Sequence, residues 1–147
     1  MNESITITSP KSSADYSKYY DLRWRILRAP WQQVQGSEKD ELEATAFHLM
    51  AMEKDLIVAV GRLHFIDDST AQIRYMAVES DYEGRGYGKA ILTTLEKHAL
   101  LYKIKKIILD ARENAVGFYQ KQGYDIINES HVLYGEIRHF RMKRELN

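Results

Sequence analysis

Three alternating glycines form the stretch of the sequence best suited to bind a ligand. Gly84, Gly86 and Gly88 stand at alternate positions. Arg85 lies between the first two, and Lys89 directly follows the third. Glycine allows a backbone to approach a ligand closely and to adopt torsions that other residues avoid. If a helix begins here, its free N–H groups and its positive dipole end favour an anion, usually a phosphate. The turn therefore predicts a phosphate or pyrophosphate site; the alternative is a tight turn in which the glycines only relieve strain.

Two common phosphate motifs do not fit this turn. A P-loop needs a serine or threonine after its lysine, but an alanine follows Lys89. The dinucleotide fingerprint GxGxxG needs a third glycine, and counted from Gly84 or Gly86 that position holds a lysine or an isoleucine. Asp110 lies at about the spacing of a ribose-binding acid, yet the strands before the turn resemble an antiparallel meander. A nicotinamide- or flavin-dependent oxidoreductase is therefore disfavoured.

Composition narrows the class of protein. The 147 residues suit one domain that spans 1–147. The 21 basic side chains are balanced by 21 acidic ones, so no excess charge is available to bind nucleic acid by neutralising phosphates. Without cysteine, disulfides, thiolate metal sites and a cysteine nucleophile are excluded. The five histidines are scattered without ligand spacing, so no metal site is expected.

The sequence predicts a cytoplasmic protein that makes no use of a membrane. The first ten residues are polar and lack the apolar core of a signal peptide. No apolar run approaches the roughly 20 residues of a membrane span.

The elements before the glycine turn are predicted from residue patterns. Residues 4–8 resemble a short edge strand, and the spacing of Ser12 and Asp15 resembles a capping box that starts a helix, which Pro30 ends. The predicted inner face of this helix is mostly aromatic: Tyr16, Tyr20, Trp24 and Leu27. The polar stretch 31–43 predicts a loop that could form one wall of a substrate site, or a plain solvated loop.

Strands and two further helices account for the rest. Strands are expected at 44–52, 56–66, 70–78, 105–111, 124–128 and 131–144, with helices from the glycine turn to about 101 and from 114 to 122. Gly123 stands where the second of these helices should end. The strand–helix–strand unit around the turn implies one parallel crossover in a mostly antiparallel sheet, hence a mixed α/β fold.

Two segments together resemble the GNAT superfamily of N-acyltransferases. VESDYEGRGYG at 78–88 is similar to the loop Arg/Gln-x-x-Gly-x-Gly/Ala that binds the acyl-CoA pyrophosphate. NAVGFYQKQGY at 114–124 is similar to the family's Asn-x-x-x-Phe-Tyr-x-x-x-Gly-Phe/Tyr helix. Shorter segments at 48–49, 109–112 and 137–142 further resemble the small bacterial ElaA-like branch. The resemblance implies a six- to seven-stranded sheet with helices on both faces, and acetyl-CoA as co-substrate for acetyl transfer to an amine that the sequence does not identify.

The resemblance also implies a set of site residues. Those expected to bind the coenzyme are Met76, Ala77, Val78, Gly84, Arg85, Gly86, Tyr87, Gly88, Lys89, Asn114 and Tyr119. The strand before the turn would pair its free edge with the pantetheine arm, and its N–H groups would polarise the thioester carbonyl. That role requires the strand to separate from 105–111, so a bulge is expected near 74–77. Asn114 is either a pantetheine ligand or a plain helix N-cap.

Tyr119 is the candidate general acid. A thiol has a pKa of about 8.5 and a tyrosine of about 10, so a neutral tyrosine can donate to the departing CoA thiolate. The alternative is a core tyrosine on an amphipathic helix.

The sequence does not identify the base that deprotonates the amine. Candidates are His48, His139, Glu41 and Glu43; the histidines titrate in the useful range and could face one cleft, or could merely pack in the sheet. Arg112, at a strand end, could bind an acidic substrate group or the coenzyme.

One residue departs from the family pattern. Glu83 occupies the position of the usual Arg or Gln, and a carboxylate there would repel phosphate, so we expect it to turn outward, toward Arg85 or another basic residue. Because of Glu83, a second function is also considered: a non-catalytic acyl-CoA sensor or interaction module. The last strands also offer an edge on which a homodimer could form.

Overall fold

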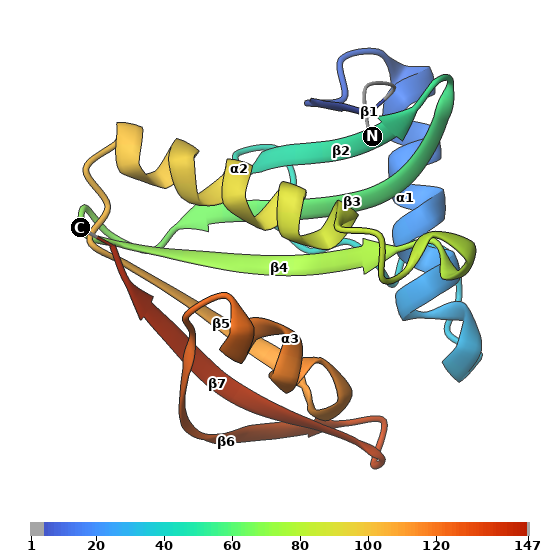
Figure 1. Ribbon diagram of the computed structural model, residues 1–147. Coiled ribbons are helices and arrows are strands. Elements are labelled where there is room, and N and C mark those ends of the chain that lie inside the picture. Colours follow the sequence, from blue (N-terminus) through green and yellow to red (C-terminus); the bar gives the residue numbers. More distant parts are fainter. Residues whose placement is uncertain (1–4, 147) are drawn as a thin grey trace.

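A seven-stranded sheet forms the centre of the computed structural model, which describes residues 5–146 (Figure 1). Its strand order is β1-β2-β3-β4-β5-β7-β6, and β4 and β5 are the parallel pair. The strands are β1 (Ile5–Thr8), β2 (Phe47–Glu53), β3 (Leu56–Phe65), β4 (Thr70–Val78), β5 (Lys106–Arg112), β6 (Asp125–Leu133) and β7 (Ile137–Glu145). The helices are α1 (Ser13–Leu27), α2 (Tyr87–Leu101) and α3 (Val116–Lys121), with short 3₁₀ turns at Ala29–Trp31, Ser80–Tyr82 and Glu113–Ala115. The predicted mixed α/β class is confirmed.

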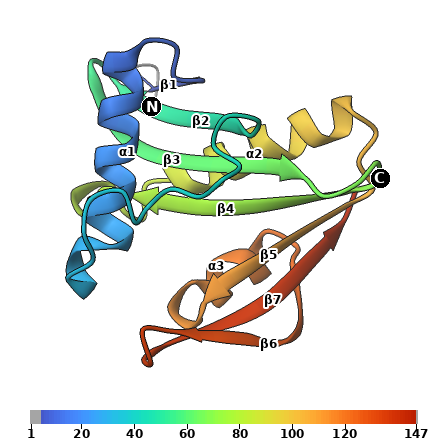
Figure 2. The same cartoon turned by 180° about the vertical axis from the view of Figure 1, so that it is seen from behind.

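Helices cover both faces of the sheet. α2 and α3 lie on one face and α1 on the other, as the two opposite views show (Figures 1 and 2). Each face has its own apolar core, because successive residues of a strand point to opposite sides. Leu49 and Ala51 of β2 belong to the core under α2, whereas Met50 belongs to the core under α1. Within residues 5–146, no helix combines the length and the apolar character that crossing a bilayer requires.

α1 begins where its capping box predicts but turns a different face inward. The Ser12 hydroxyl accepts from the Asp15 N–H at 3.0 Å, and the Asp15 carboxylate accepts from the Ser12 N–H. The predicted inner face is only partly confirmed: Tyr16, Tyr20 and Leu27 pack against the core under α1, but none of these residues, nor Trp24, is fully buried. The buried residues are Tyr19, Leu22 and Arg23. A count of apolar residues misses this face because it contains an arginine whose charge is paired inside the protein.

β4 separates from β5 halfway along its length. The parallel pairing covers only Thr70–Ile73 against Lys106–Leu109. Beyond it, β5 and its neighbours fan away from β4 (Figure 1). At the same level β4 carries one extra residue relative to β3, since Arg74 pairs with Arg62 but Ala77 pairs with Val60. The expected bulge is thus confirmed.

The last two strands differ from their predicted bounds. β6 continues through Leu133, and the turn lies at Tyr134 and Gly135, both with positive φ. The predicted break near 129–130 and the strand 131–144 were wrong. β6 is an edge strand exposed along almost all its length, so polar residues there do not interrupt it. β2 also starts three residues later than predicted, after a turn in which the Ala46 N–H donates to the Leu42 carbonyl. The part of the first predicted strand at residue 4 lies outside the described residues.

Candidate active site

The N-terminus of α2 presents unused backbone donors. Gly86 is the N-cap at φ 90° and provides no side-chain cap. Ala90 makes the first helical bond, to the Gly86 carbonyl at 3.0 Å, so the N–H groups of the preceding turn have no partner among the described residues. A side chain added at Gly84 or Gly86 would meet nothing within 4 Å. Both glycines are therefore needed for their positive φ, and the space beside them is open to an anion.

The side chains around this turn differ in their exposure to solvent. Arg85 and Lys89 are exposed, and the Arg85 guanidinium lies 5.0 Å from the centre of the Tyr82 ring. Glu83 is exposed as expected, but among residues 5–146 it forms no ion pair with Arg85. Tyr87 is buried, and its hydroxyl donates to Glu53 at the end of β2. Only the backbone of Tyr87 is available to a ligand here, whereas the side chains of Arg85 and Lys89 are free to add charge.

The edge of β4 beyond Ile73 is the second feature of the site. From Arg74 to Val78 the strand has lost its β5 partner, so backbone groups on that side are unpaired within the described chain. Met76 and Val78 contact the core under α2, and Ala77 contacts the core under α1. The three predicted coenzyme residues therefore share a strand whose edge is open and whose end leads to the glycine turn.

Tyr119 lies in the apolar core under α2, beside a residue that packs at the start of α2. Its side chain is 7% exposed, and its ring packs edge-on against Phe118 and Tyr124. Phe118 in turn touches the start of α2, since a Cβ at Gly88 would lie 3.5 Å from its ring. Burial raises the pKa of Tyr119, which keeps its phenol protonated at neutral pH. No partner for its hydroxyl is found among residues 5–146, so it is free to donate elsewhere.

Asn114 does not cap the helix that follows. α3 has Ala115 at its N-cap position and no side-chain cap bond. Asn114 lies exposed in the 3₁₀ turn before it. The N-cap reading of Asn114 is therefore wrong, and its amide is not engaged at the end of α3.

The two candidate histidines share a face of the sheet but not a site. His48 bonds to Tyr19 of α1, and His139 lies opposite Arg112, which bonds to the last residue of α1. The order β2-β3-β4-β5-β7 puts four strand steps between them, which is about 19 Å at the usual spacing of about 4.8 Å and more where β4 and β5 have separated. They cannot both contact one reacting group.

The hydrogen bonds of the two histidines differ. His48 Nε2 is 2.7 Å from the Glu43 carbonyl and must donate to it, and Nδ1 is 2.7 Å from the Tyr19 hydroxyl, so both ring nitrogens are engaged. His139 Nδ1 donates to the Ile137 carbonyl at 3.0 Å, which leaves Nε2 with a free lone pair. Burial, and then the neighbouring His131 ring, lowers the pKa of His139, so this nitrogen is unprotonated at neutral pH.

The bulge residue Tyr75 is held by charges that the sequence analysis missed. Tyr75 has φ 60°, a strained conformation for an aromatic residue. Four guanidinium groups lie within 6 Å of its ring centre, at distances of 4.2 to 5.8 Å: those of Arg23, Arg28, Arg62 and Arg74. Such cation–π contacts stabilise the ring by about 0.5–2 kcal/mol each. Arg74 precedes Tyr75 directly, but no local signal in the sequence could have revealed the other three, because they come from α1, the residue after it and β3.

The 31–43 loop supplies the acids that balance most of this charge. Arg62 donates to Asp40 at 2.6 Å and to Glu43 at 3.0 Å, and Arg23 donates to Glu43 at 2.8 Å. Burial would raise the pKa of Asp40, but the Arg62 bonds lower it to about 2. Glu43 is committed to two arginines and Glu41 is exposed, so neither is arranged as the base.

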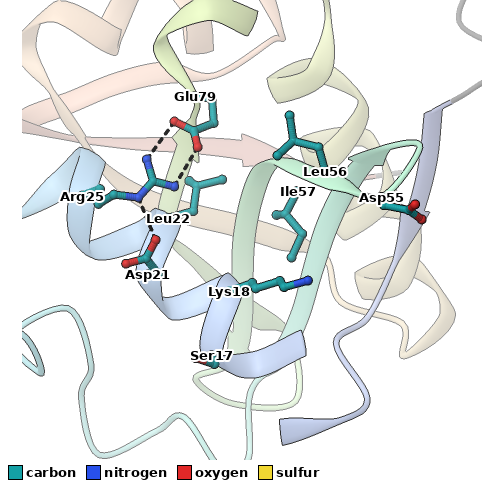
Figure 3. Close-up of a pocket in the computed structure, with 9 residues that line it drawn as sticks. All are labelled: Ser17, Lys18, Asp21, Leu22, Arg25, Asp55, Leu56, Ile57 and Glu79. Atoms are coloured by element: carbon teal, nitrogen blue, oxygen red, sulfur yellow. Dashed lines mark hydrogen bonds and ion pairs between the residues drawn. The ribbon is translucent and has the colours of Figure 1, made fainter. Parts of the chain in front are cut away.

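A separate surface hollow lies beside α1, the β2–β3 turn and the residue after β4 (Figure 3). Three of its charges are paired with each other: Arg25 donates to Asp21 at 2.7 Å and to both oxygens of Glu79 at 3.0 and 2.7 Å. This arrangement ties α1 to the end of β4, while Lys18 and Asp55 line the same hollow without joining these pairs.

Comparisons with known proteins agree on one family. The model of the acetyltransferase (GNAT) family matches residues 16–124. The uncharacterized N-acetyltransferase YjcF of Bacillus subtilis is 30% identical over 115 residues, which cover 78% of this chain and 81% of that protein.

Solved structures have the same fold. A crystal structure from Lactobacillus plantarum, provisionally named an N-acetyltransferase, has a TM-score of 0.86 at 19% identity and covers 99% of this chain and 100% of its own. A GNAT acetyltransferase of Elizabethkingia anophelis with acetyl-CoA bound has a TM-score of 0.75 at 18% identity, over 98% and 99% of the two chains. Escherichia coli ElaA, the branch noted from the sequence, has a TM-score of 0.75 at 22% identity over 96% and 98%.

Proposed function

Because the chain belongs to the acetyltransferase (GNAT) family, we propose that it transfers the acetyl group of acetyl-CoA to a primary amine by direct attack. The observation that carries this proposal is the separation of β4 from β5 after Ile73, directly before an uncapped, glycine-rich helix start. An extended ligand with a phosphate end fits that order of features.

The coenzyme would use backbone more than side chains. Its pyrophosphate would accept from the N–H groups between Gly84 and Lys89, with the helix dipole and the charges of Arg85 and Lys89 in support. Its pantetheine arm would pair with Met76, Ala77 and Val78 as an added strand. The exposed Asn114 amide, free of a capping bond, would be available to the same arm. Unpaired N–H groups of the bulge would stabilise the oxyanion of the thioester carbon.

The acid and the base would approach from opposite faces of the sheet. The amine nitrogen forms a bond to the thioester carbon, and the carbon–sulfur bond breaks. Tyr119, in the core under α2, donates its phenolic proton to the leaving thiolate. His139 Nε2, on the α1 face, accepts a proton from the amine, directly or through water. We assign the base to His139 and a structural role to His48, because His48 has no free ring nitrogen.

Replacing the Tyr119 hydroxyl tests the proposal. Tyr119→Phe keeps the ring packing and removes only the donor, so we expect turnover to fall by at least about tenfold while acetyl-CoA affinity and melting temperature change little. Thiol release from acetyl-CoA across a panel of amines measures turnover. Tyr102→Phe is the matched control, since Tyr102 is 59% exposed at the end of α2. Unchanged turnover in Tyr119→Phe would remove the assigned role.

An acyl-CoA sensor on the same fold is the second candidate. Glu83 favours it, because the exposed carboxylate stands beside the unpaired N–H groups that would bind the pyrophosphate. Acetyl-CoA binding without thiol release by any amine of the panel would support the sensor against the enzyme.

A further inference from the structure

Two arginines meet at the end of α1. Arg112 Nη2, from the end of β5, donates to the Leu27 carbonyl at 2.8 Å, across 85 positions of sequence. Arg28, directly after α1, donates to the same carbonyl through Nη1 at 3.3 Å. Two guanidinium groups therefore share one acceptor, although like charges repel each other.

The charge of this pair is not balanced by the described protein. Arg23, Arg62 and Arg74 nearby pair with Asp40 or Glu43. By contrast, neither Arg28 nor Arg112 has an acidic partner among residues 5–146. Burial, and then the charge of Arg28, lowers the pKa of Arg112. The end of a helix supplies only about half a negative charge. The buried Glu38 is next in sequence to Ser37, whose carbonyl Arg28 bonds, but its carboxylate accepts from the Gly36 N–H and forms no salt bridge with either arginine in the described chain.

Donors of both side chains are left over. The Nε of Arg28 donates to the Ser37 carbonyl at 3.1 Å, but its Nη2 has no partner in the described chain. Nε and Nη1 of Arg112 also have no partner in the described chain. Fully buried side-chain atoms without partners occur only at Nε of Arg23 and Arg62 in residues 5–146, so solvent reaches these remaining donors. Yet Arg28 as a whole is 8% exposed, which is rare for an unpaired charge.

The pair lies beside the open edge of β4. The Arg28 guanidinium is 5.8 Å from the ring centre of the bulge residue Tyr75. Arg112 is three residues past Leu109, where β5 leaves β4, and lies opposite His139 in the β5–β7 strand register. Both arginines belong to the α1 face, whereas the start of α2 packs on Phe118 of α3 on the other face. The pair is thus on the side of the proposed base and away from the proposed phosphate site.

We propose that Arg28 and Arg112 bind a carboxylate of the acceptor, so that the substrate is an amine that also carries an acid, such as an amino acid. This inference rests on the proposed function, because it names the acceptor of that reaction. Guanidinium groups match a carboxylate with parallel hydrogen bonds, and a carboxylate would complete the charge balance of the pair. A coenzyme phosphate would be a poorer match, since it enters from the other face.

Matched ligands test the inference without any mutation. Calorimetric titration of the protein with CoA present compares several amino acids with their amides, which keep the amine and lose the charge. We expect each acid to bind at least about tenfold more tightly than its amide. Equal affinity, including no measurable binding of either, would overturn the inference.

Variants assign the preference to the pair. Arg112→Gln and, separately, Arg28→Gln should abolish the preference for the acid, whereas Arg138→Gln should keep it, because Arg138 is an exposed surface residue of β7 paired with Glu113 and Glu129. If both pair variants keep the preference, or instead weaken CoA binding, the inference is wrong.

Thiol-release assays separate this inference from the proposed function. Transfer to neutral amines as fast as to amino acids would leave the acetyltransferase proposal intact and overturn the acid-binding role. Selective binding of acids without acetyl transfer to any of them would support the acid-binding role and contradict the acetyltransferase proposal.

Discussion

At the scale of single residues, the glycine turn contains its own opposing charge. Glu83 is exposed and within three positions of the helix start, where a negative charge competes with a bound phosphate. The backbone donors do not depend on it, since Gly84 and Gly86 hold the turn by their torsions. Residue 83 should therefore tune coenzyme affinity without deciding whether the site exists.

Replacing Glu83 with arginine should tighten acetyl-CoA binding. The change removes a repulsive charge and adds donors that suit a pyrophosphate, so the Kd from calorimetry should fall about tenfold or more. Glu83→Gln is the control that removes only the charge and should give a smaller effect. An unchanged Kd in the arginine variant would show that Glu83 does not weaken acetyl-CoA binding.

Two arginines of one helix should differ in their contribution to stability. Arg23 is fully buried and donates to Glu43 at 2.8 Å, while Arg25 is 41% exposed and pairs with Asp21 and Glu79. Arg23→Met should lower the free energy of unfolding by about 3 kcal/mol, because it leaves a buried acid with a partner missing. Arg25→Met should cost less than about 1 kcal/mol. Urea unfolding measures both free energies, and equal losses would contradict a larger contribution of the buried Arg23–Glu43 pair.

At the scale of elements, the two glycines at the start of α2 have different surroundings. Gly86 has φ 90° and open space beside it, whereas Gly88 has an ordinary φ, and a Cβ added there would lie 3.5 Å from the Phe118 ring. The first glycine shapes the turn, and the second lies where α2, β4 and α3 meet, with room for a methyl group. The site is therefore built by the junction of three elements rather than by the loop alone.

Alanine at these two positions should have opposite consequences. Gly86→Ala forces a left-handed torsion on a residue with a Cβ and should cost about 1–2 kcal/mol of stability. Gly88→Ala adds an ordinary van der Waals contact inside a helix and should be neutral or slightly stabilising. Thermal unfolding of the two variants checks this, and a larger loss for Gly88→Ala would show that α2 and α3 pack more tightly than described.

At the scale of the whole molecule, two buried and two half-buried histidines link stability to pH. Burial lowers the pKa of His48, His64, His98 and His139 in the folded protein. An unfolded histidine titrates near about 6.5, so below that pH the unfolded chain binds more protons than the folded one. The acids with lowered pKa values, such as Asp40, act in the same direction but only below about pH 4.

Stability should therefore fall on mild acidification. Between pH 7.5 and 5 the free energy of unfolding should decrease, with a slope of at most about 1.4 kcal/mol per pH unit for each histidine. Urea unfolding at several pH values gives this slope, and His48→Gln should reduce it even if the variant is less stable overall. A flat or rising profile would contradict the neutral, buried state of these rings.

The sequence alone determined the features that depend on near neighbours. The capping box at Ser12, the glycine turn, the end of α3 at Gly123 and the order of strands and helices all follow from torsions, periodicity and short-range hydrogen bonds. The two matched motifs also placed the chain in its family, since their residues lie within short segments. The exceptions included the fully buried face of α1 and the β6–β7 turn, where a buried charge and an exposed edge strand break the usual pattern.

Only the tertiary structure decided which distant side chains meet. Tyr75 lies among arginines from α1, β3 and β4, His48 uses both ring nitrogens, and Arg112 reaches Leu27 across 85 positions. A sequence pattern records the type and spacing of residues along the chain, whereas these contacts depend on how strands are ordered and where β4 leaves β5. The glycine turn proposed to bind the coenzyme could thus be found in the sequence, but the arginine pair proposed to select the acceptor could not.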